Sequence, residues 1–309
     1  AMFIAIFGKM CISLFTLLGG YGAYISLSRA KSRTELVSRH IFRLYSSYWK
    51  VFAIAVPVSL FLGLPHGSPF FTDLIYSFLG LRFTYCDEWW FVTPFAVLTV
   101  FSPLIADFAD RRNASFQSSL LWIICANAAI YYIIPPLMRN PALAEFSGTV
   151  FWTEVYTAMT LLPAYALGAV LAKHNVLSAV KAYCRAGRTL CIPAALIVLC
   201  ALLYIHPFNW LAYDFINAAV FIMCMLALLE SRIGTLITPV VIKLGEESAC
   251  MWLVHTLLCY KWCQKLVYAP KYAVLIFLWL VALSYGFARL IRLLYSALGK
   301  LCSGVFKKV

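Results

Sequence analysis

Apolar stretches of transmembrane length constrain this chain more than any other feature of its sequence. An α-helix needs about 20 mostly apolar residues to cross ~30 Å of hydrocarbon. The stretches that approach this length are 5–27, 51–64, 91–108, 118–138, 150–172, 189–205, 210–230, 249–260 and 272–294. Two of them, 51–64 and 249–260, are short and would need to extend into their flanks. The sequence therefore predicts about nine transmembrane helices.

The composition agrees with this prediction. Of the 309 residues, 63% are hydrophobic and only 12% are charged, and the mean hydropathy is +0.87. A soluble domain of this size could not cover so much apolar surface with so little charge. We therefore expect an all-α integral membrane protein, a polytopic helical bundle that forms a single domain over residues 1–309.

The basic residues follow the order of the expected helices. Lys and Arg outnumber Asp and Glu by 25 to 12. Nineteen of the basic residues fall in alternate segments, which begin with 28–50 and end with the C-terminal tail, and five fall in the other segments. This is the positive-inside pattern, so we expect a cytoplasmic C-terminus and explain the basic excess without a nucleic-acid partner. The same map places the N-terminus outside, so we expect a missing preceding helix, which would bring the total to about ten.

Ionisable residues inside an apolar span are candidates for function, because burying a charge in lipid costs at least ~2.5–3.5 kcal/mol. His255 is the sharpest candidate, since a neutral imidazole can act as base, acid or hydrogen-bond partner. A histidine that a neighbouring helix satisfies is an equally good interpretation. Glu154 could line a polar cavity or reach the headgroups. Glu246 and Glu247 stand at the expected entrance of the 249–260 helix.

Two further patterns admit both a structural and a functional interpretation. The small residues of "LLGGYGAY" (17–24) let another backbone approach closely, so helix packing is the favoured explanation, and a ligand against the backbone is the alternative. Arg39 and Arg43 are four residues apart and would share one helix face. Two guanidinium groups on one face suit a phosphate or pyrophosphate, although lipid headgroups fit the same description.

The outer segment 65–90 is long and aromatic, so it would either dip into the membrane and cap the bundle or form an ordinary interfacial belt. The eleven cysteines show no paired spacing. We therefore expect neither a metal site nor a disulfide framework.

Taken in order, several motifs resemble those of the membrane-bound acyltransferase 3 family. "CISLFTLLGGYGAYISL" is similar to a family helix that ends in Ser-Gly-Tyr, and it places Tyr21 at the tyrosine. "RHIFRLYSSYW" resembles the basic segment that follows, with Arg39 and Arg43 at its two arginines. "DEWWFVTPFAVLTVFSPLI" and "LPAYALGAVLAKHNV" resemble later helices. The most specific match is "LGEESACMWLVHT", in which Trp252 replaces a tyrosine and His255 fills the histidine position.

The chain departs from the family pattern in three places. Gly19 stands where the family has a serine. The family's first helix carries an Arg and, about three turns later, a His, and no such pair occurs here, which agrees with a missing helix. One branch of the family has a Glu shortly after the tryptophan, whereas the nearest acids here are upstream, at Asp87 and Glu88.

The resemblance implies a bacterial inner-membrane O-acyltransferase. It would move an acyl group, such as acetyl, from acyl-CoA (acetyl-CoA) to a hydroxyl of a cell-surface or lipid-linked sugar. The phosphates of the CoA would bind Arg39 and Arg43. His255 would be the base or a positioning group, with Tyr21 as a hydrogen-bond partner. If the missing helix supplies the main histidine, His255 becomes structural support.

Four more residues are expected at the sugar acceptor: Asp87, Glu88, Trp90 and Glu154. Besides donor and acceptor, membrane lipid is the expected partner. A non-enzymatic transporter or flippase of a polar lipid-linked substrate is the alternative, because the same bundle and buried charges would serve it. Transporters often show internal repeats or broken helices in matching halves, and the sequence shows neither.

Overall fold

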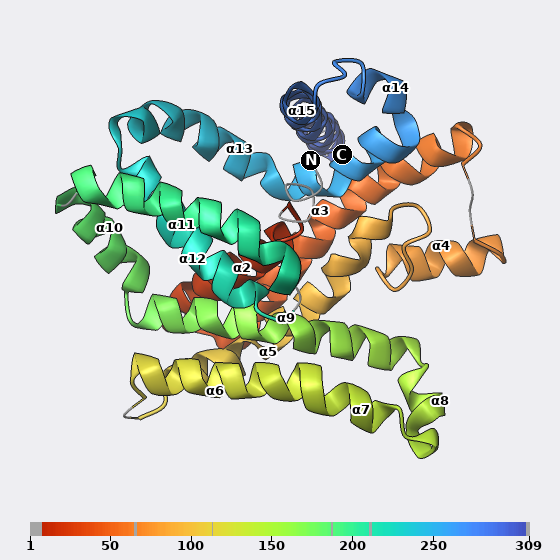
Figure 1. The fold of residues 1–309 in the computed structure, drawn as a ribbon. Helices are drawn as coiled ribbons and strands as arrows, with labels where there is room; N and C mark the ends of the chain where they lie inside the picture. The colour runs from red at the N-terminus through yellow and green to blue at the C-terminus, as the bar shows by residue number, and fades with distance from the viewer. Residues whose placement is uncertain (1–7, 65–66, 113, 187, 210–211, 307–309) are drawn as a thin grey trace. The chain divides into compact units, whose positions relative to one another are not determined.

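The computed structural model describes residues 8–64, 67–112, 114–186, 188–209 and 212–306 (Figure 1). Within these ranges all regular secondary structure is helical, which confirms the all-α prediction. The elements are α2 (Cys11–Ser28), α3 (Arg33–Phe61), α4 (Phe70–Phe78), η1 (Asp87–Phe91), α5 (Val92–Ala109), α6 (Phe116–Ala128), η2 (Ala129–Ile133), α7 (Ile134–Met138), η3 (Pro141–Leu143), α8 (Ala144–Ser147), α9 (Val150–Lys173), α10 (Val176–Ala186), α11 (Arg188–Asn209), α12 (Asp214–Leu229), α13 (Arg232–Thr256), η4 (Leu257–Trp262), α14 (Gln264–Val267) and α15 (Ala273–Phe306).

Six helical segments of the described chain are long and apolar enough to cross a membrane. They are Cys11–Ser28, Arg33–Phe61, Asp87–Ala109, Phe116–Met138, Val150–Lys173 and Ala273–Lys300. Two shorter apolar helices, Leu190–Ile205 and Asp214–Leu229, accompany them. Large apolar side chains such as Phe61 and Leu190 are 91% and 78% exposed, as expected where lipid is the solvent. The chain is a multi-pass membrane protein, and the count of nine helices stays a prediction.

The two short apolar stretches belong to longer helices. The stretch 51–64 lies mostly in α3, which begins at Arg33, and much of the basic segment 28–50 is therefore helical. The stretch 249–260 lies in α13 and the π-helical turn η4, and α13 begins at Arg232. The prediction that Glu246 and Glu247 stand at a helix entrance is therefore wrong. The helix continues through the charged positions although Gly245 and Ser248, which favour a helix less than alanine does, flank them.

The chain divides into two compact units, and the first comprises residues 1–41 and 93–238. In it α2 packs along α9, and α6 lies beside α9 (Figure 1). A Cβ atom on Gly20 would lie 1.9 Å from the carbonyl oxygen of Tyr165, and one on Gly168 would lie 2.0 Å from that of Leu17. Only glycines allow the two backbones to approach this closely. The packing interpretation of the glycine-rich stretch 17–24 is thus confirmed at Gly20.

The second unit comprises residues 42–92 and 239–309, and aromatic side chains form much of its core. Trp89 of η1 is fully buried and lies edge-on to Tyr48, with ring centroids 5.2 Å apart. Phe52 packs against the same indole at 5.9 Å. Such pairs contribute roughly 0.5–1.5 kcal/mol beyond the area they bury. They fix η1 against α3.

The segment 65–90 contains α4, whose polar side is buried and whose apolar side is exposed. Asp73 is 1% exposed, whereas Phe71 and Ile75 are 75% and 60% exposed. The carboxylate of Asp73 accepts hydrogen bonds from the Gly67 N–H (3.1 Å) and the Thr84 hydroxyl (2.8 Å). A helix with its apolar side outward suits a lipid contact. This agrees both with a segment that dips into the membrane and caps the bundle and with an interfacial aromatic belt.

Candidate active site

The orientation of His255 leaves one ring nitrogen available for chemistry. His255 is half-buried in the last turn of α13, and its Nδ1 lies 2.6 Å from the carbonyl oxygen of Trp252. A carbonyl oxygen can only accept, so in the neutral ring Nδ1 carries the proton and Nε2 keeps its lone pair. Nε2 has no hydrogen-bond partner among the described residues. The imidazole is therefore held in the tautomer that a base at Nε2 requires.

The 3₁₀-helix η1 packs against this end of α13. The indole N–H of Trp89 donates to the carbonyl oxygen of Leu253 at 3.0 Å. The Cys86 Sγ lies 3.1 Å from the Thr256 hydroxyl oxygen. Trp89 is fully buried, so its indole N–H needs a hydrogen-bond partner within the protein, and the carbonyl oxygen of Leu253 is that partner. Two chain segments about 165 residues apart are joined here.

This packing brings three of the predicted acceptor residues near the end of α13 that carries His255. Asp87, Glu88 and Trp90 all lie on η1. Asp87 is exposed, and Glu88 and Trp90 are half-buried. An accessible acidic pair and an indole are the side chains that a sugar would need for hydrogen bonds and for an apolar ring face.

Lys261 also belongs to this region, and the sequence analysis missed it. Its Nζ donates to the carbonyl oxygens of Tyr85 at 2.8 Å and Thr84 at 3.3 Å. The sequence feature that could have indicated Lys261 is its position six residues after His255, at the end of the same apolar stretch. The Lys261 contacts tie η4 to the chain just before η1.

Cys86 is not a nucleophile in this arrangement. Burial raises the pKa of its thiol to about 11, and the hydrogen bond with Thr256 offsets this only in part. Because the thiolate is the reactive form, Cys86 stays inert near neutral pH. Among the described residues, no three His, Cys, Asp or Glu side chains gather into a metal-binding group.

The predicted phosphate-binding arginines lie one turn apart on α3. Arg39 forms an ion pair with Glu35, with Nη2 and Oε1 2.7 Å apart and both side chains largely exposed. The guanidinium of Arg43 is exposed and makes no ion pair within the described part of the chain. An exposed pair contributes less than about 1 kcal/mol, so Arg39 can exchange its partner at little cost.

Tyr21 and Glu154 lie in the first unit, on α2 and α9, whereas His255 lies in the second. Glu154 is 9% exposed, and its Oε2 has no hydrogen-bond partner among the described residues. A buried carboxylate oxygen without a partner is costly, which makes Glu154 a strong candidate for contact with a bound polar group. Tyr21 lies beside the Gly168 crossing.

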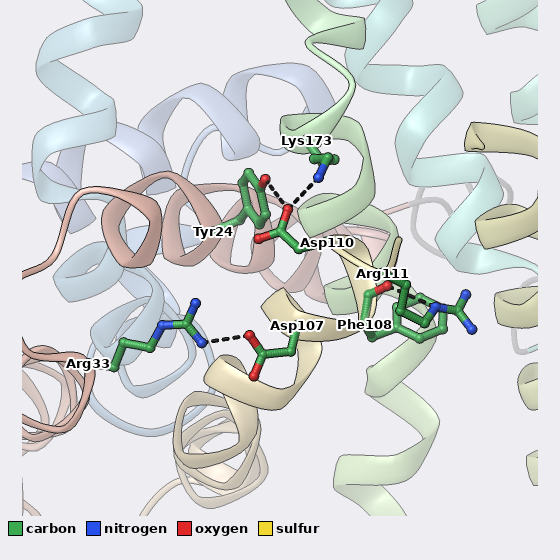
Figure 2. A network of polar contacts seen from close by, with 7 residues as sticks. All are labelled: Tyr24, Arg33, Asp107, Phe108, Asp110, Arg111 and Lys173. Carbon is green, nitrogen blue, oxygen red and sulfur yellow. Dashed lines mark hydrogen bonds and ion pairs between the residues drawn. The ribbon is translucent and has the colours of Figure 1, made fainter. Parts of the chain in front are cut away.

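A polar network joins the ends of α2, α5 and α9 (Figure 2). The Asp110 carboxylate accepts from the Tyr24 hydroxyl at 2.8 Å and from Lys173 Nζ at 2.5 Å. Burial acts to raise the pKa of Asp110, but the hydrogen bonds with Lys173 and Tyr24 outweigh it and lower that pKa below its ordinary value. Nearby, Arg33 pairs with Asp107 at 2.6 Å.

A second buried charge lies on α13 itself. Glu247 is 4% exposed, and its Oε1 lies 3.1 Å from Arg292 Nη2 and 3.4 Å from Arg289 Nη1. The two arginines are three residues apart on α15 and so share a face. They supply the hydrogen-bonding partners that offset the lost hydration of this buried side chain. Glu247 is eight residues from His255, or about 12 Å along the helix.

The fold and these side chains define a multi-pass helical membrane protein with a histidine and two acids close to one helix end. The family profile described as an acyltransferase domain matches residues 1–292. The chain therefore belongs to the acyltransferase 3 family and is a membrane acyltransferase, as the resemblance implied. No curated protein and no solved structure matched the chain.

Proposed function

We propose that this acyltransferase moves an acyl group, in the first instance acetyl, from acyl-CoA to a hydroxyl of a cell-surface or lipid-linked sugar. The observation that carries the proposal is His255, because its Nδ1 is anchored on a backbone carbonyl and its Nε2 is free. Acyl transfer needs a base for the attacking hydroxyl and a donor for the oxyanion that develops on the thioester carbonyl.

In the proposed reaction the sugar hydroxyl attacks the thioester carbonyl carbon while Nε2 of His255 takes the hydroxyl proton. The tetrahedral intermediate then collapses, the C–S bond breaks, and the proton passes to the leaving CoA sulfur. Asp87 and Glu88 hydrogen-bond other hydroxyls of the acceptor, and Trp90 covers an apolar face of its ring. Tyr21 lies in the other unit and stays a proposed hydrogen-bond partner of the substrates, with no role assigned beside His255.

The donor would approach from the basic side of the membrane. Arg43 is exposed and unpaired in the described chain, and Arg39 is held only by an exposed pair, so both can bind the phosphates of CoA. The distribution of basic residues supports a cytoplasmic C-terminus in a bacterial inner membrane, with acyl-CoA arriving from the cytoplasm.

The test is transfer of isotope-labelled acetyl from acetyl-CoA to envelope glycans, followed by mass spectrometry, in membranes that contain this chain. Matched membranes without the chain are the control. A labelled sugar ester above the control supports the proposal. A transporter or flippase would give no label.

A second readout separates the two functions at the donor. A ligand that binds only the folded state must stabilise it, so CoA should raise the melting temperature of the purified enzyme. Arg43→Gln should weaken this effect, whereas Lys31→Gln, an exposed basic residue before α3, should not. A transporter would show no shift with CoA in any of these proteins.

A further inference from the structure

An open apolar groove lies in the first unit between α5, α6 and α9. Its volume is about 690 Å³, and every residue that lines it is apolar, including Leu104, Phe108, Trp122 and Phe151. This volume falls within the ~300–1,000 Å³ typical of ligand sites. The indole N–H of Trp122 is the one polar side-chain group among these lining residues, so the groove suits a hydrocarbon chain far better than a sugar or a nucleotide.

Arg111 makes cation–π contacts with two of the aromatic side chains that line the groove. Its guanidinium carbon lies 4.1 Å from the ring centroid of Phe108 and 5.9 Å from that of Trp122. Its Nε donates to the backbone carbonyl oxygen of Phe108 at 3.1 Å. The stacking and this hydrogen bond fix the guanidinium beside the groove.

The positive charge of Arg111 is not compensated within the described residues. The two acids that precede it in the sequence already have partners, since Asp107 pairs with Arg33 and Asp110 binds Lys173 and Tyr24. Figure 2 shows the guanidinium of Arg111 directed away from both carboxylates. Its two terminal nitrogens make no hydrogen bond in the described chain, so the end of the guanidinium is available to an anion.

We propose that this groove binds one anionic phospholipid of the surrounding membrane, with an acyl chain against α5, α6 and α9 and the phosphate on Arg111. The planar guanidinium donates two parallel hydrogen bonds to phosphate oxygens, a geometry that a lysine cannot offer. The charge on Arg111 makes the site prefer an anionic headgroup over a zwitterionic one. The inference is independent of the acyl-transfer proposal, because it concerns binding and uses other residues.

The first experiment compares the binding of phosphatidylglycerol and phosphatidylcholine to the purified protein by native mass spectrometry. The wild-type protein should retain phosphatidylglycerol more strongly, and Arg111→Gln should lower that preference roughly fivefold, the scale of one basic residue at an anionic surface. Arg112→Gln is the matched control, since Arg112 is exposed and is not among the residues that line the groove. Equal binding of the two lipids, or equal losses in both variants, would overturn the proposal.

The second experiment tests the groove itself. Ala126 lines the groove and is exposed, so Ala126→Phe fills part of it without overpacking the core. Cys125→Phe adds the same ring at an exposed neighbour outside the lining. Only the first variant should lose bound phosphatidylglycerol. If Ala126→Phe binds as much lipid as Cys125→Phe, the lipid is merely annular and the proposed site is refuted.

Discussion

Replacing Gly20 with alanine should destabilise the crossing of α2 and α9. The new Cβ would lie 1.9 Å from the Tyr165 carbonyl oxygen, whereas Cβ contacts below 3.0 Å essentially do not occur. The helices must therefore separate by about 1.1 Å, the difference between these two distances. Overpacking of this kind typically costs about 1–3 kcal/mol. At about 2–4 °C per kcal/mol, the melting temperature should fall by several degrees.

Gly22→Ala is the matched control for this prediction. Gly22 lies on the same helix, and a Cβ there would meet nothing within 4 Å. An alanine at an open helical position stabilises by roughly 0.5–1 kcal/mol relative to glycine, so the two substitutions should have opposite signs. Thermal unfolding in detergent, followed by tryptophan fluorescence, measures both. Equal melting temperatures for the two variants would refute the close crossing.

Three further predictions concern buried and paired polar groups. Glu247→Gln should lower the free energy of unfolding by about 1–3 kcal/mol, because it removes charge-assisted hydrogen bonds to two arginines. Glu246→Gln is the control: Glu246 is exposed, so thermal unfolding of this variant should differ little from that of the wild type. Trp89→Phe should lower stability by about 1–3 kcal/mol, because a buried carbonyl of α13 loses its donor, and denaturant unfolding measures this loss. The pKa of Asp110 is lower in the folded state than its ordinary value of 3.8. The ionised carboxylate therefore stabilises the fold at pH values above 3.8, and this stabilisation is lost as the pH falls through the pKa of the folded state. Asp110→Asn should therefore be less stable than wild type at neutral pH, and melts at decreasing pH should show the difference narrowing.

The fold class could be predicted because it depends on properties that are local in sequence. Apolar length and the alternation of basic segments need no knowledge of contacts. Helix boundaries were harder at charged positions. The sequence of α13 does not show that arginines on α15 meet Glu247, so the acidic pair predicts a helix entrance rather than the interior of a helix.

The candidate site was only partly predictable for the same reason. His255 stands out in its own sequence because an ionisable ring in an apolar stretch is costly. Its neighbourhood depends on η1, which lies about 165 residues earlier, and on hydrogen bonds from Trp89 and Lys261 to backbone carbonyls. Every residue has a backbone carbonyl, so a sequence does not show which carbonyl accepts a side-chain hydrogen bond. No motif could therefore have indicated these contacts.

The most direct test of the account is the rate of labelled acetyl transfer by His255→Gln in membranes, compared with wild type. His174→Gln is the control, since it removes another histidine at the end of a helix. If Nε2 of His255 is the base, His255→Gln should lose about 10²–10⁴-fold in rate, while His174→Gln keeps most of it and both proteins melt as wild type does. Transfer by His255→Gln at the wild-type rate would contradict the central claim.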